Sequence, residues 1–223
     1  MEGVIVFDMD GVLVDVSQSY RETVRATVRH FGGPDVSQDR IQDYKNSGGW
    51  NNDWALTQKI LADSGIEVAY DTVVKEFNRI FFGENNDGLM QRERWIVAPG
   101  VLERLAEQYA ICIFTGRLQF EAQMTLDRFC PNVRWSKIVA DDNVARSKPA
   151  PDGLLDILAA HPNLPLTYIG DTIDDARSAQ AASVRFVGIA HRNQPKRDEL
   201  VGLLWQHGAV AVLENVNELE AAL

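Results

Sequence analysis

The chain alternates between short apolar runs and longer segments in which apolar residues recur at helical spacing. The first run is Val4–Phe7, and two later runs are Ala110–Phe114 and Leu166–Ile169. Runs of this length, rich in β-branched and aromatic residues, are typical of buried strands. Strands that alternate with helices predict a parallel sheet covered on both faces. We therefore expect an α/β fold with a doubly wound, Rossmann-like parallel sheet.

The alternation resumes at Pro99 and continues to the end of the sequence. Further short strands are expected near Lys137–Ala140, Arg185–Ile189 and Val210–Leu213. The expected helices are Val101–Gln108, Leu118–Phe129, Asp152–Ala160, Ile173–Ala182, Lys196–Gln206 and Val216–Ala222. Together with the first strand, these elements predict one core sheet.

Residues 16–95 show helical patterns and no clear strand. One helical stretch starts near Ser17, and Tyr70–Phe82 carries an apolar stripe at helical spacing. Two more helices are expected between them, with candidate N-caps at Ser37 or Asp39 and at Asn52 or Asp53. We therefore expect a core of residues 1–15 and 96–223, and an all-helical domain of residues 16–95 inserted after the first strand.

Two aspartates follow the first strand. Asp8 falls where the strand ends, and Asp10 lies two residues on, before Gly11. Strand periodicity places the two side chains on the same side of the backbone. Carboxylates held that close repel each other unless a cation or a shared proton relieves them. The pair indicates metal binding, acid–base chemistry or both, although Asp and Gly are also common in surface turns.

Polar residues also follow the later strands. They are, in chain order, Thr115, Gly116 and Arg117; Lys148 and Pro149; and Gly170, Asp171 and Asp175. Each has a structural alternative: Thr115 as a helix N-cap, Lys148 as a solvated surface lysine, and the aspartates as residues that favour a helix N-terminus. Because ligands of open α/β sheets bind outside the carboxyl ends of the strands, these side chains are expected to share one crevice.

In this order and at these strand ends, the segments resemble the four signature motifs of the haloacid dehalogenase superfamily. The matching segments are Asp8-Met9-Asp10-Gly11-Val12-Leu13 with Asp15, Thr115-Gly116-Arg117, Lys148-Pro149, and Gly170-Asp171 with Asp175. Each motif alone is weak, but the ordered set is specific. The chain is similar to phosphatase-type members of the phosphoglycolate phosphatase-like subfamily, which implies that residues 16–95 are a helical cap domain closing over the active site. One departure is Ser183, which stands where many relatives have glycine.

The resemblance implies a role for each matched residue. Asp8 would be the nucleophile that forms an aspartyl-phosphate, and Asp10 the general acid–base. Thr115, through its hydroxyl, and Gly116, through its backbone N–H, would bind the phosphate. Lys148 would supply a fixed positive charge to the phosphate and to Asp8.

The resemblance also implies a metal site. Its ligands would be the Asp8 side chain, the Asp10 backbone carbonyl and Asp171, with Asp175 as a supporting ligand, direct or through water. Asp174 is the neighbouring alternative to Asp175, which is favoured because its spacing from Asp171 matches the family's pattern. An all-oxygen site suits Mg²⁺, which is the expected cofactor.

The expected activity is that of a phosphoric monoester hydrolase acting on a small phosphorylated metabolite. One alternative is a phosphomutase of the same superfamily. Another is a non-catalytic phosphate-binding or regulatory protein on this fold, which the intact set of catalytic residues disfavours. A dehalogenase or phosphonatase is disfavoured because those relatives lack an aspartate at the position of Asp10.

The loop of residues 45–53 is the expected substrate-selecting element. It is polar and rich in glycine, and its candidate contacts are Lys45, Trp50 and Asn51. Packing between helices is the alternative for both tryptophans of this region and is preferred for Trp54. Three arginines could meet a second anionic group of the substrate or could lie at the surface: Arg92, Arg94 and Arg117.

Charge restricts the expected partners. The formal net charge is -10 at pH 7, so nucleic acid and anionic membranes are unfavourable partners. The two cysteines fit reduced thiols in the cytoplasm. The sequence begins directly with the first strand and no apolar stretch approaches membrane-spanning length, so we expect a cytoplasmic protein without signal peptide or transmembrane helix.

Overall fold

The computed structural model describes all 223 residues and contains two compact units. The first unit is Met1–Val14 with Trp95–Leu223, and the second is Asp15–Arg94. The chain passes between them through two short strands that pair with each other, β2 (Val14–Asp15) and β3 (Arg94–Trp95). Neither strand was expected, because two residues are too few to show a periodicity. The assignment of a catalytic core and a cap domain stays a prediction.

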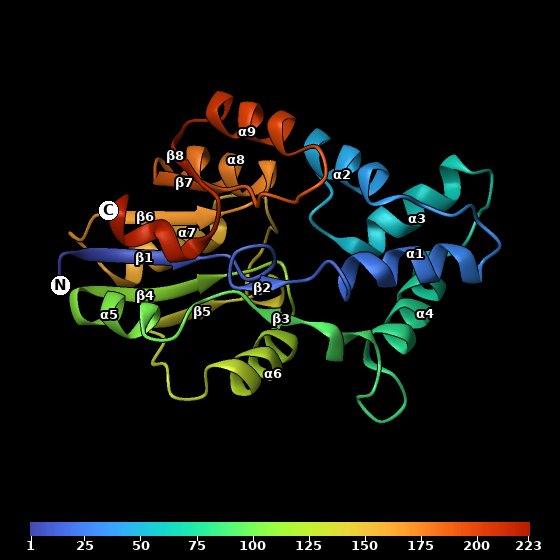
Figure 1. Cartoon of the computed structure of the whole chain (residues 1–223), viewed down its shortest axis with the longest axis horizontal. Helices are drawn as coiled ribbons and strands as arrows, with labels where there is room; N and C mark the ends of the chain where they lie inside the picture. The colour runs from blue at the N-terminus through green and yellow to red at the C-terminus, as the bar shows by residue number, and fades with distance from the viewer. The chain divides into compact units, whose positions relative to one another are not determined.

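The first unit is built on a six-stranded sheet with the order β5-β4-β1-β6-β7-β8. Its strands are β1 (Gly3–Phe7), β4 (Tyr109–Phe114), β5 (Lys137–Val139), β6 (Leu166–Gly170), β7 (Arg185–Ile189) and β8 (Ala209–Leu213). Every neighbouring pair is parallel, and the drawn strands β1, β4 and β6 point the same way in Figure 1. With the helices described below, this confirms the expected α/β fold.

Helices connect these strands, as the apolar periodicity predicts. They are α5 (Val101–Gln108), α6 (Gln119–Phe129), α7 (Asp152–Ala160), α8 (Ile173–Ala182) and α9 (Arg197–Gln206). Val4 and Val6 of β1 share a buried cluster with α7, α8 and α9, whereas Ile5 and Phe7 point to the other face. Both faces of the central strand are therefore buried, which explains its continuous apolar sequence.

Three short segments are 3₁₀ helices: η1 (Leu89–Arg92), η2 (Asp141–Asn143) and η3 (Val216–Ala221). The expected C-terminal α-helix is thus wrong in type. The Asn217 side chain accepts a hydrogen bond from Ala98 N (2.7 Å) and donates one to the Ile96 carbonyl (3.1 Å). A segment this short, tied to a distant part of the chain, forms tight turns rather than a regular α-helix.

The second unit contains four α-helices: α1 (Tyr20–His30), α2 (Gln38–Ser47), α3 (Asp53–Asp63) and α4 (Tyr70–Phe82). Ser37 caps α2 by accepting from Arg40 N (3.1 Å), and Asn52 caps α3 by accepting from Ala55 N (2.9 Å). Trp54 is half-buried, and its indole N–H donates to the side chain of Asn78 on α4 (3.1 Å). Trp54 therefore packs helices together, as preferred from the sequence.

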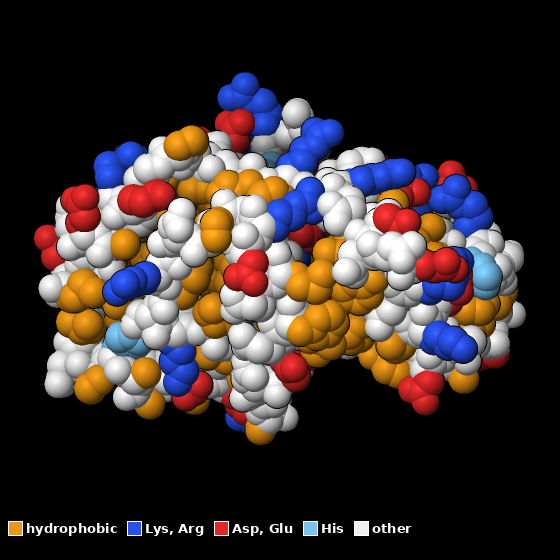
Figure 2. All heavy atoms as spheres, turned by 90° about the horizontal axis from the view of Figure 1, so that it is seen from below, with side chains coloured by type: hydrophobic (Ala, Val, Ile, Leu, Met, Phe, Trp, Pro, Cys, Tyr) orange, Lys and Arg blue, Asp and Glu red, His pale blue; other side chains and the backbone are white.

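The surface and the helices bear on possible partners. None of the helices is both long and apolar enough to cross a lipid bilayer. On the face shown in Figure 2, acidic and basic side chains are interspersed. This face lacks the continuous basic surface that phosphate backbones of nucleic acids require.

Candidate active site

Three candidate catalytic or metal-binding residues of the first unit lie at the carboxyl ends of three neighbouring strands. Asp8 follows β1, Thr115 follows β4 and Asp171 follows β6. The last residue of β1 is level with Ile113 of β4 and Ile169 of β6, so the three strands end side by side. The order of the sheet puts β1 where the winding changes direction, and open α/β sheets bind ligands at such a point.

The loop after β1 is a tight turn that depends on a glycine. Gly11 N donates to the Val14 carbonyl (2.8 Å), and Val14 N donates back to the Met9 carbonyl (3.0 Å). Gly11 has φ +73°, and an added Cβ would lie 1.9 Å from Asp171 Oδ2. His191, just past β7, places its Nε2 2.7 Å from the Gly11 carbonyl oxygen. Only glycine allows both this backbone conformation and the close approach of Asp171.

Lys148 is a buried cation and not a surface lysine. Its side chain is 1% exposed, and its Nζ lies 2.9 Å from Asp8 Oδ1 and 2.8 Å from Asp175 Oδ1. The ammonium group also lies over the rings of Phe114 and Tyr168, at 4.8 and 5.4 Å from their centroids. Burial alone lowers the pKa of Lys148, but the two carboxylates outweigh it and raise that pKa above its usual value.

Asp175 is fully buried, and both of its carboxylate oxygens accept hydrogen bonds. Oδ1 accepts from Lys148 Nζ (2.8 Å) and from the Tyr168 hydroxyl (2.6 Å). Oδ2 accepts from the backbone N–H groups of Asp171 and Thr172 and from the Thr172 hydroxyl (3.2, 3.1 and 2.7 Å). Burial raises the pKa of Asp175, but Lys148 and these donors lower it more, so that pKa lies below its usual range. Asp175 therefore orients both Lys148 and the start of the Asp171 loop.

Tyr168 was missed in the sequence as a member of the site. It lies inside an apolar strand and reads there as a core residue. The available signal was its hydroxyl, because a fully buried tyrosine usually needs a hydrogen-bond partner. The partner is Asp175, with Phe114 O at 3.4 Å as a weaker second acceptor.

Thr115 and Gly116 lie beside these groups at the end of β4. Thr115 is buried, and its backbone N–H extends the sheet ladder by donating to the Val139 carbonyl (3.0 Å). Its hydroxyl oxygen accepts from Arg117 N (3.2 Å). Gly116 is exposed. The assignment of both to phosphate binding stays a prediction.

Asp10 forms an ion pair with Arg117, a partner that the sequence analysis did not predict for either residue. Arg117 Nε and Nη2 lie 2.7 and 2.5 Å from Asp10 Oδ1, and Arg117 Nη1 donates to Thr125 Oγ1 on α6 (2.6 Å). The Arg117 side chain is 2% exposed and that of Asp10 is 32% exposed. A surface position for Arg117 is therefore wrong, whereas Arg92 and Arg94 are exposed.

Three buried carboxylates could hold a metal ion. Asp8, Asp171 and Asp175 each offer an oxygen, and these atoms lie within 4.8 Å of one another. Asp8 Oδ1 is buried, and its neighbour is the Lys148 ammonium group, with which it forms an ion pair at 2.9 Å. Burial, opposed by Lys148 and reinforced by neighbouring carboxylates, raises the pKa of Asp8 to about 7. A divalent cation would relieve this excess of buried negative charge, so the residues fit one.

The loop of residues 45–53 is tied together within the second unit. Lys45 Nζ donates to the Trp50 carbonyl (2.8 Å) and pairs with Asp53 Oδ1 (2.7 Å). The Trp50 ring meets the Tyr44 ring edge to face at 5.9 Å, and both Trp50 and Asn51 are half-buried. Lys45 thus shapes the loop, and a role of this loop in substrate selection stays a prediction.

Comparisons with known proteins agree on one family. Residues 5–189 match the family model described as haloacid dehalogenase-like hydrolase. A phosphoglycolate phosphatase of Colwellia psychrerythraea is 24% identical over 230 residues, which cover 99% of this chain and 96% of that protein. A solved structure from Bacteroides fragilis, described as a haloacid dehalogenase-like hydrolase, superposes with a TM-score of 0.78 at 22% identity, covering 98% of this chain and 100% of the other.

One relative is much longer than this chain. An imidazoleglycerol-phosphate dehydratase of Phytophthora nicotianae is 29% identical over 201 residues, which cover 83% of this chain and 42% of that protein. The chain thus spans less than half of that relative, and the activity in its name does not carry over.

Proposed function

Because the chain belongs to the haloacid dehalogenase-like hydrolases, we propose that it is a Mg²⁺-dependent phosphatase that cleaves a small phosphorylated metabolite through an aspartyl-phosphate. The resemblance recognised in the sequence is confirmed by the family match. The observation that carries the proposal is the buried Asp8 carboxylate, which has one oxygen without a hydrogen bond and lies 2.9 Å from Lys148. The ammonium group beside it offsets the repulsion between this carboxylate and an incoming phosphate.

The reaction would take place in two steps. An Asp8 oxygen attacks phosphorus, the bond from phosphorus to the ester oxygen breaks, and Asp10 gives its proton to the leaving alkoxide. Asp10, now ionised, takes a proton from water, which attacks the same phosphorus. The Asp8–phosphate bond breaks, and inorganic phosphate and free Asp8 are released. Both steps use the same two residues in alternating roles.

The surrounding groups would stabilise the charge that develops on the phosphoryl oxygens. Lys148 is held beside Asp8 by Asp175, so its ammonium group needs no reorganisation during the reaction. Thr115 and the Gly116 N–H would bind the remaining oxygens at the end of β4. Fixed donors of this kind are worth more inside a buried site than in water.

Mg²⁺ would be held by Asp8, the Asp10 backbone carbonyl and Asp171. It would neutralise the repulsion between the Asp8 carboxylate and the incoming phosphate. Because both oxygens of Asp175 already accept hydrogen bonds, we propose that Asp175 supports the site mainly by orienting Asp171 and Lys148.

Substrate choice is assigned to the second unit as part of the same proposal. Lys45, Trp50 and Asn51 lie in one loop that is pinned from within, so its shape is stable enough to select a ligand. Both cysteines are unpaired, which supports the proposed cytoplasmic location.

Trapping the phosphoenzyme tests the proposal. Purified protein is mixed with Mg²⁺ and a panel of phosphoglycolate, sugar phosphates, histidinol phosphate and nucleoside monophosphates, and is then quenched in acid for peptide mass analysis. We expect one phosphoryl group on the peptide that contains Asp8, and neither label nor turnover in Asp8→Asn. Near-wild-type phosphate release by Asp8→Asn would sink the mechanism.

The same experiment separates a phosphatase from a phosphomutase. With ¹⁸O-labelled water, a phosphatase releases inorganic phosphate that carries the label. A mutase would instead return an isomeric sugar phosphate, need a bisphosphate for activation and release little phosphate.

A further inference from the structure

We propose that Arg117 is a positioning residue that holds the Asp10 carboxylate for proton transfer and does not bind the substrate. The inference deepens the proposed function and rests on it, because Asp10 transfers protons only if that mechanism operates. The contacts with Asp10, Thr115 and Thr125 that carry it lie within the first unit.

The contact between Arg117 and Asp10 is directed at a single oxygen. Both Nε and Nη2 of the guanidinium reach Asp10 Oδ1, at 2.7 and 2.5 Å. Hydrogen bonds from a charged guanidinium are short and strong, and Oδ1 can accept them whether or not Oδ2 carries the proton, so this oxygen is well fixed. The side chain of Asp10 is 32% exposed, whereas its arginine partner is 2% exposed. The buried partner therefore anchors Oδ1, and Oδ2 is assigned to the proton transfer.

Arg117 is itself anchored from several directions. Its Nη1 donates to Thr125 Oγ1 on α6 (2.6 Å), and its backbone N–H donates to Thr115 Oγ1 (3.2 Å). Its carbonyl accepts from Asp141 N at the start of η2 (2.9 Å). A guanidinium held at its head, with its backbone fixed on both sides, stays in one place and cannot follow a substrate.

The expected effect follows from the geometry. Proton transfer requires the carboxylate within hydrogen-bond reach of the leaving oxygen. Losing the anchor lets the Asp10 side chain explore other rotamers, and a displacement of about 1 Å can cost on the order of a hundredfold in rate. Phosphate binding does not involve Arg117 in this account and should be unaffected.

Rapid-quench measurement of phosphoenzyme formation tests the proposal with an alkyl and an aryl phosphate. Arg117→Lys and Arg117→Met should slow the step about tenfold to hundredfold for the alkyl ester. They should slow it only a few-fold for the aryl ester, whose leaving group needs little protonation. KM for both esters should stay within a factor of about two, because Arg117 makes no contact with the bound substrate in this proposal. Thr125→Val, which removes one anchor of the guanidinium, should show the same pattern at smaller size.

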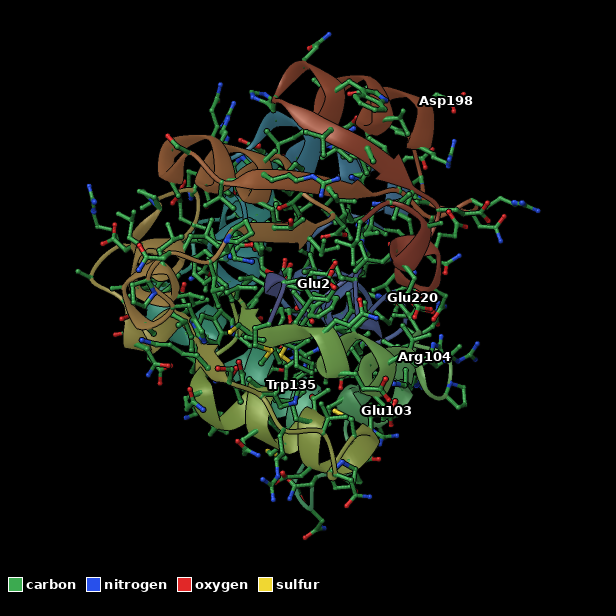
Figure 3. The ribbon with its side chains drawn as sticks, turned by 90° about the vertical axis from the view of Figure 1, so that its left-hand side faces the viewer. Glu2, Glu103, Arg104, Trp135, Asp198 and Glu220 are labelled. Carbon is green, nitrogen blue, oxygen red and sulfur yellow. The ribbon has the colours of Figure 1, made fainter.

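A double-mutant cycle separates positioning from a general structural role. If Arg117 acts through Asp10, then Arg117→Met should cost almost nothing further in an Asp10→Asn background. The matched control is Arg104→Lys, because Arg104 makes a similar two-nitrogen ion pair with Glu220 (2.9 and 2.7 Å). Figure 3 labels both residues of this pair, and Arg104→Lys should leave the rates with both esters unaffected.

The outcomes distinguish this inference from the proposed function. Suppose that Asp8→Asn forms no phosphoenzyme and that Asp10→Asn slows the alkyl ester more than the aryl ester. If Arg117→Lys then slows both esters equally or raises KM, only the inference is overturned. Additive losses in the double mutant would overturn it in the same way. If the wild type forms no phosphoenzyme from any ester, the proposed function fails and the inference fails with it.

Discussion

Each unit of this protein contains a lysine paired with aspartate, and the two pairs differ in burial. Lys148 in the first unit is 1% exposed and lies 2.9 and 2.8 Å from Asp8 and Asp175. Lys45 in the second unit is 13% exposed and lies 2.7 Å from Asp53. The fully buried group loses its hydration entirely, which opposes folding, whereas the partly exposed pair loses less.

This difference in burial separates two roles of a lysine–aspartate ion pair. Lys148 stands over two aromatic rings beside a carboxylate that has an oxygen without a hydrogen bond. A charge arrangement so costly to bury is best explained by chemistry carried out there. Lys45 bonds a backbone carbonyl of its own loop, which is an arrangement for shape. Four differences between the two units are expected to be measurable.

The largest effect is expected when each lysine is replaced by methionine. Lys148→Met should lower kcat by about a thousandfold or more, because a preorganised charge beside the reacting phosphate is lost. Lys45→Met should change the ranking of kcat/KM among substrates and leave the best kcat within about tenfold. Steady-state kinetics over a substrate panel checks both, with circular dichroism to confirm folding. Equal loss of kcat in the two variants would remove the distinction.

The next effect concerns pH in the absence of metal. The pKa of Asp8 in the folded protein is raised to about 7 from its ordinary value of 3.8. Between these two pH values the folded state therefore holds a proton that the unfolded state has lost. Stability should therefore fall as pH rises from about 4 to 7, by a few kcal/mol at most, since one unit corresponds to about 1.4 kcal/mol. Added Mg²⁺ should restore the stability that is lost at the higher pH. Asp8→Asn should remove this component of the slope and Asp53→Asn should keep it, as chemical denaturation at several pH values would reveal.

A smaller effect is expected when one uncharged hydrogen-bond donor is removed from each unit. Tyr168→Phe removes the hydroxyl that donates to Asp175 and keeps the ring under Lys148. Unfolding free energy should fall by about 1–3 kcal/mol, with a lower kcat, because a charged buried acceptor loses a donor. Trp54→Phe removes the hydrogen bond to Asn78 and should cost about 1 kcal/mol without any change in kcat. An unchanged kcat in Tyr168→Phe would show that the hydroxyl is only structural.

The smallest effect compares two helix ends. In the first unit α8 ends at Ser183 with φ +56°, and in the second unit α2 ends at Gly48 with φ +76°. Ser183→Gly should stabilise the protein by roughly 0.5–1 kcal/mol, because glycine takes the left-handed conformation without strain. Gly48→Ala should destabilise it by at least as much. Thermal unfolding of both variants measures the difference, and a destabilised Ser183→Gly would contradict the argument.

The sequence predicted the sheet and the strand ends well because apolar periodicity and turn residues are local signals. The residue range of α4 and the caps Ser37 and Asn52 agree with the sequence analysis. The pairing of Arg117 with Asp10 was out of reach, because it joins side chains that are 107 positions apart. Their contact depends on side-chain directions that periodicity does not encode.

The burial of Lys148 shows the same limit. A lysine in a polar loop is usually solvated, and only the fold brings it against Asp8 and Asp175. The role of the Tyr168 hydroxyl was missed for a different reason. The apolar pattern of the strand explains why the ring is buried, but it gives no information about the hydrogen bond of the hydroxyl. The candidate site residues are thus predictable from the sequence where they directly follow a strand. They are not predictable where their role depends on a contact with a side chain far away in the sequence.

Gly11 has a consequence for how this protein can vary. It carries no functional group, yet a single added methyl would meet Asp171 Oδ2 at 1.9 Å. Every other amino acid at this position brings the same steric conflict, whatever its polarity or charge. Sequence drift at Gly11 is therefore restricted by the room that Asp171 needs, whereas drift at Asp8 would be restricted by the reactivity proposed for its carboxylate.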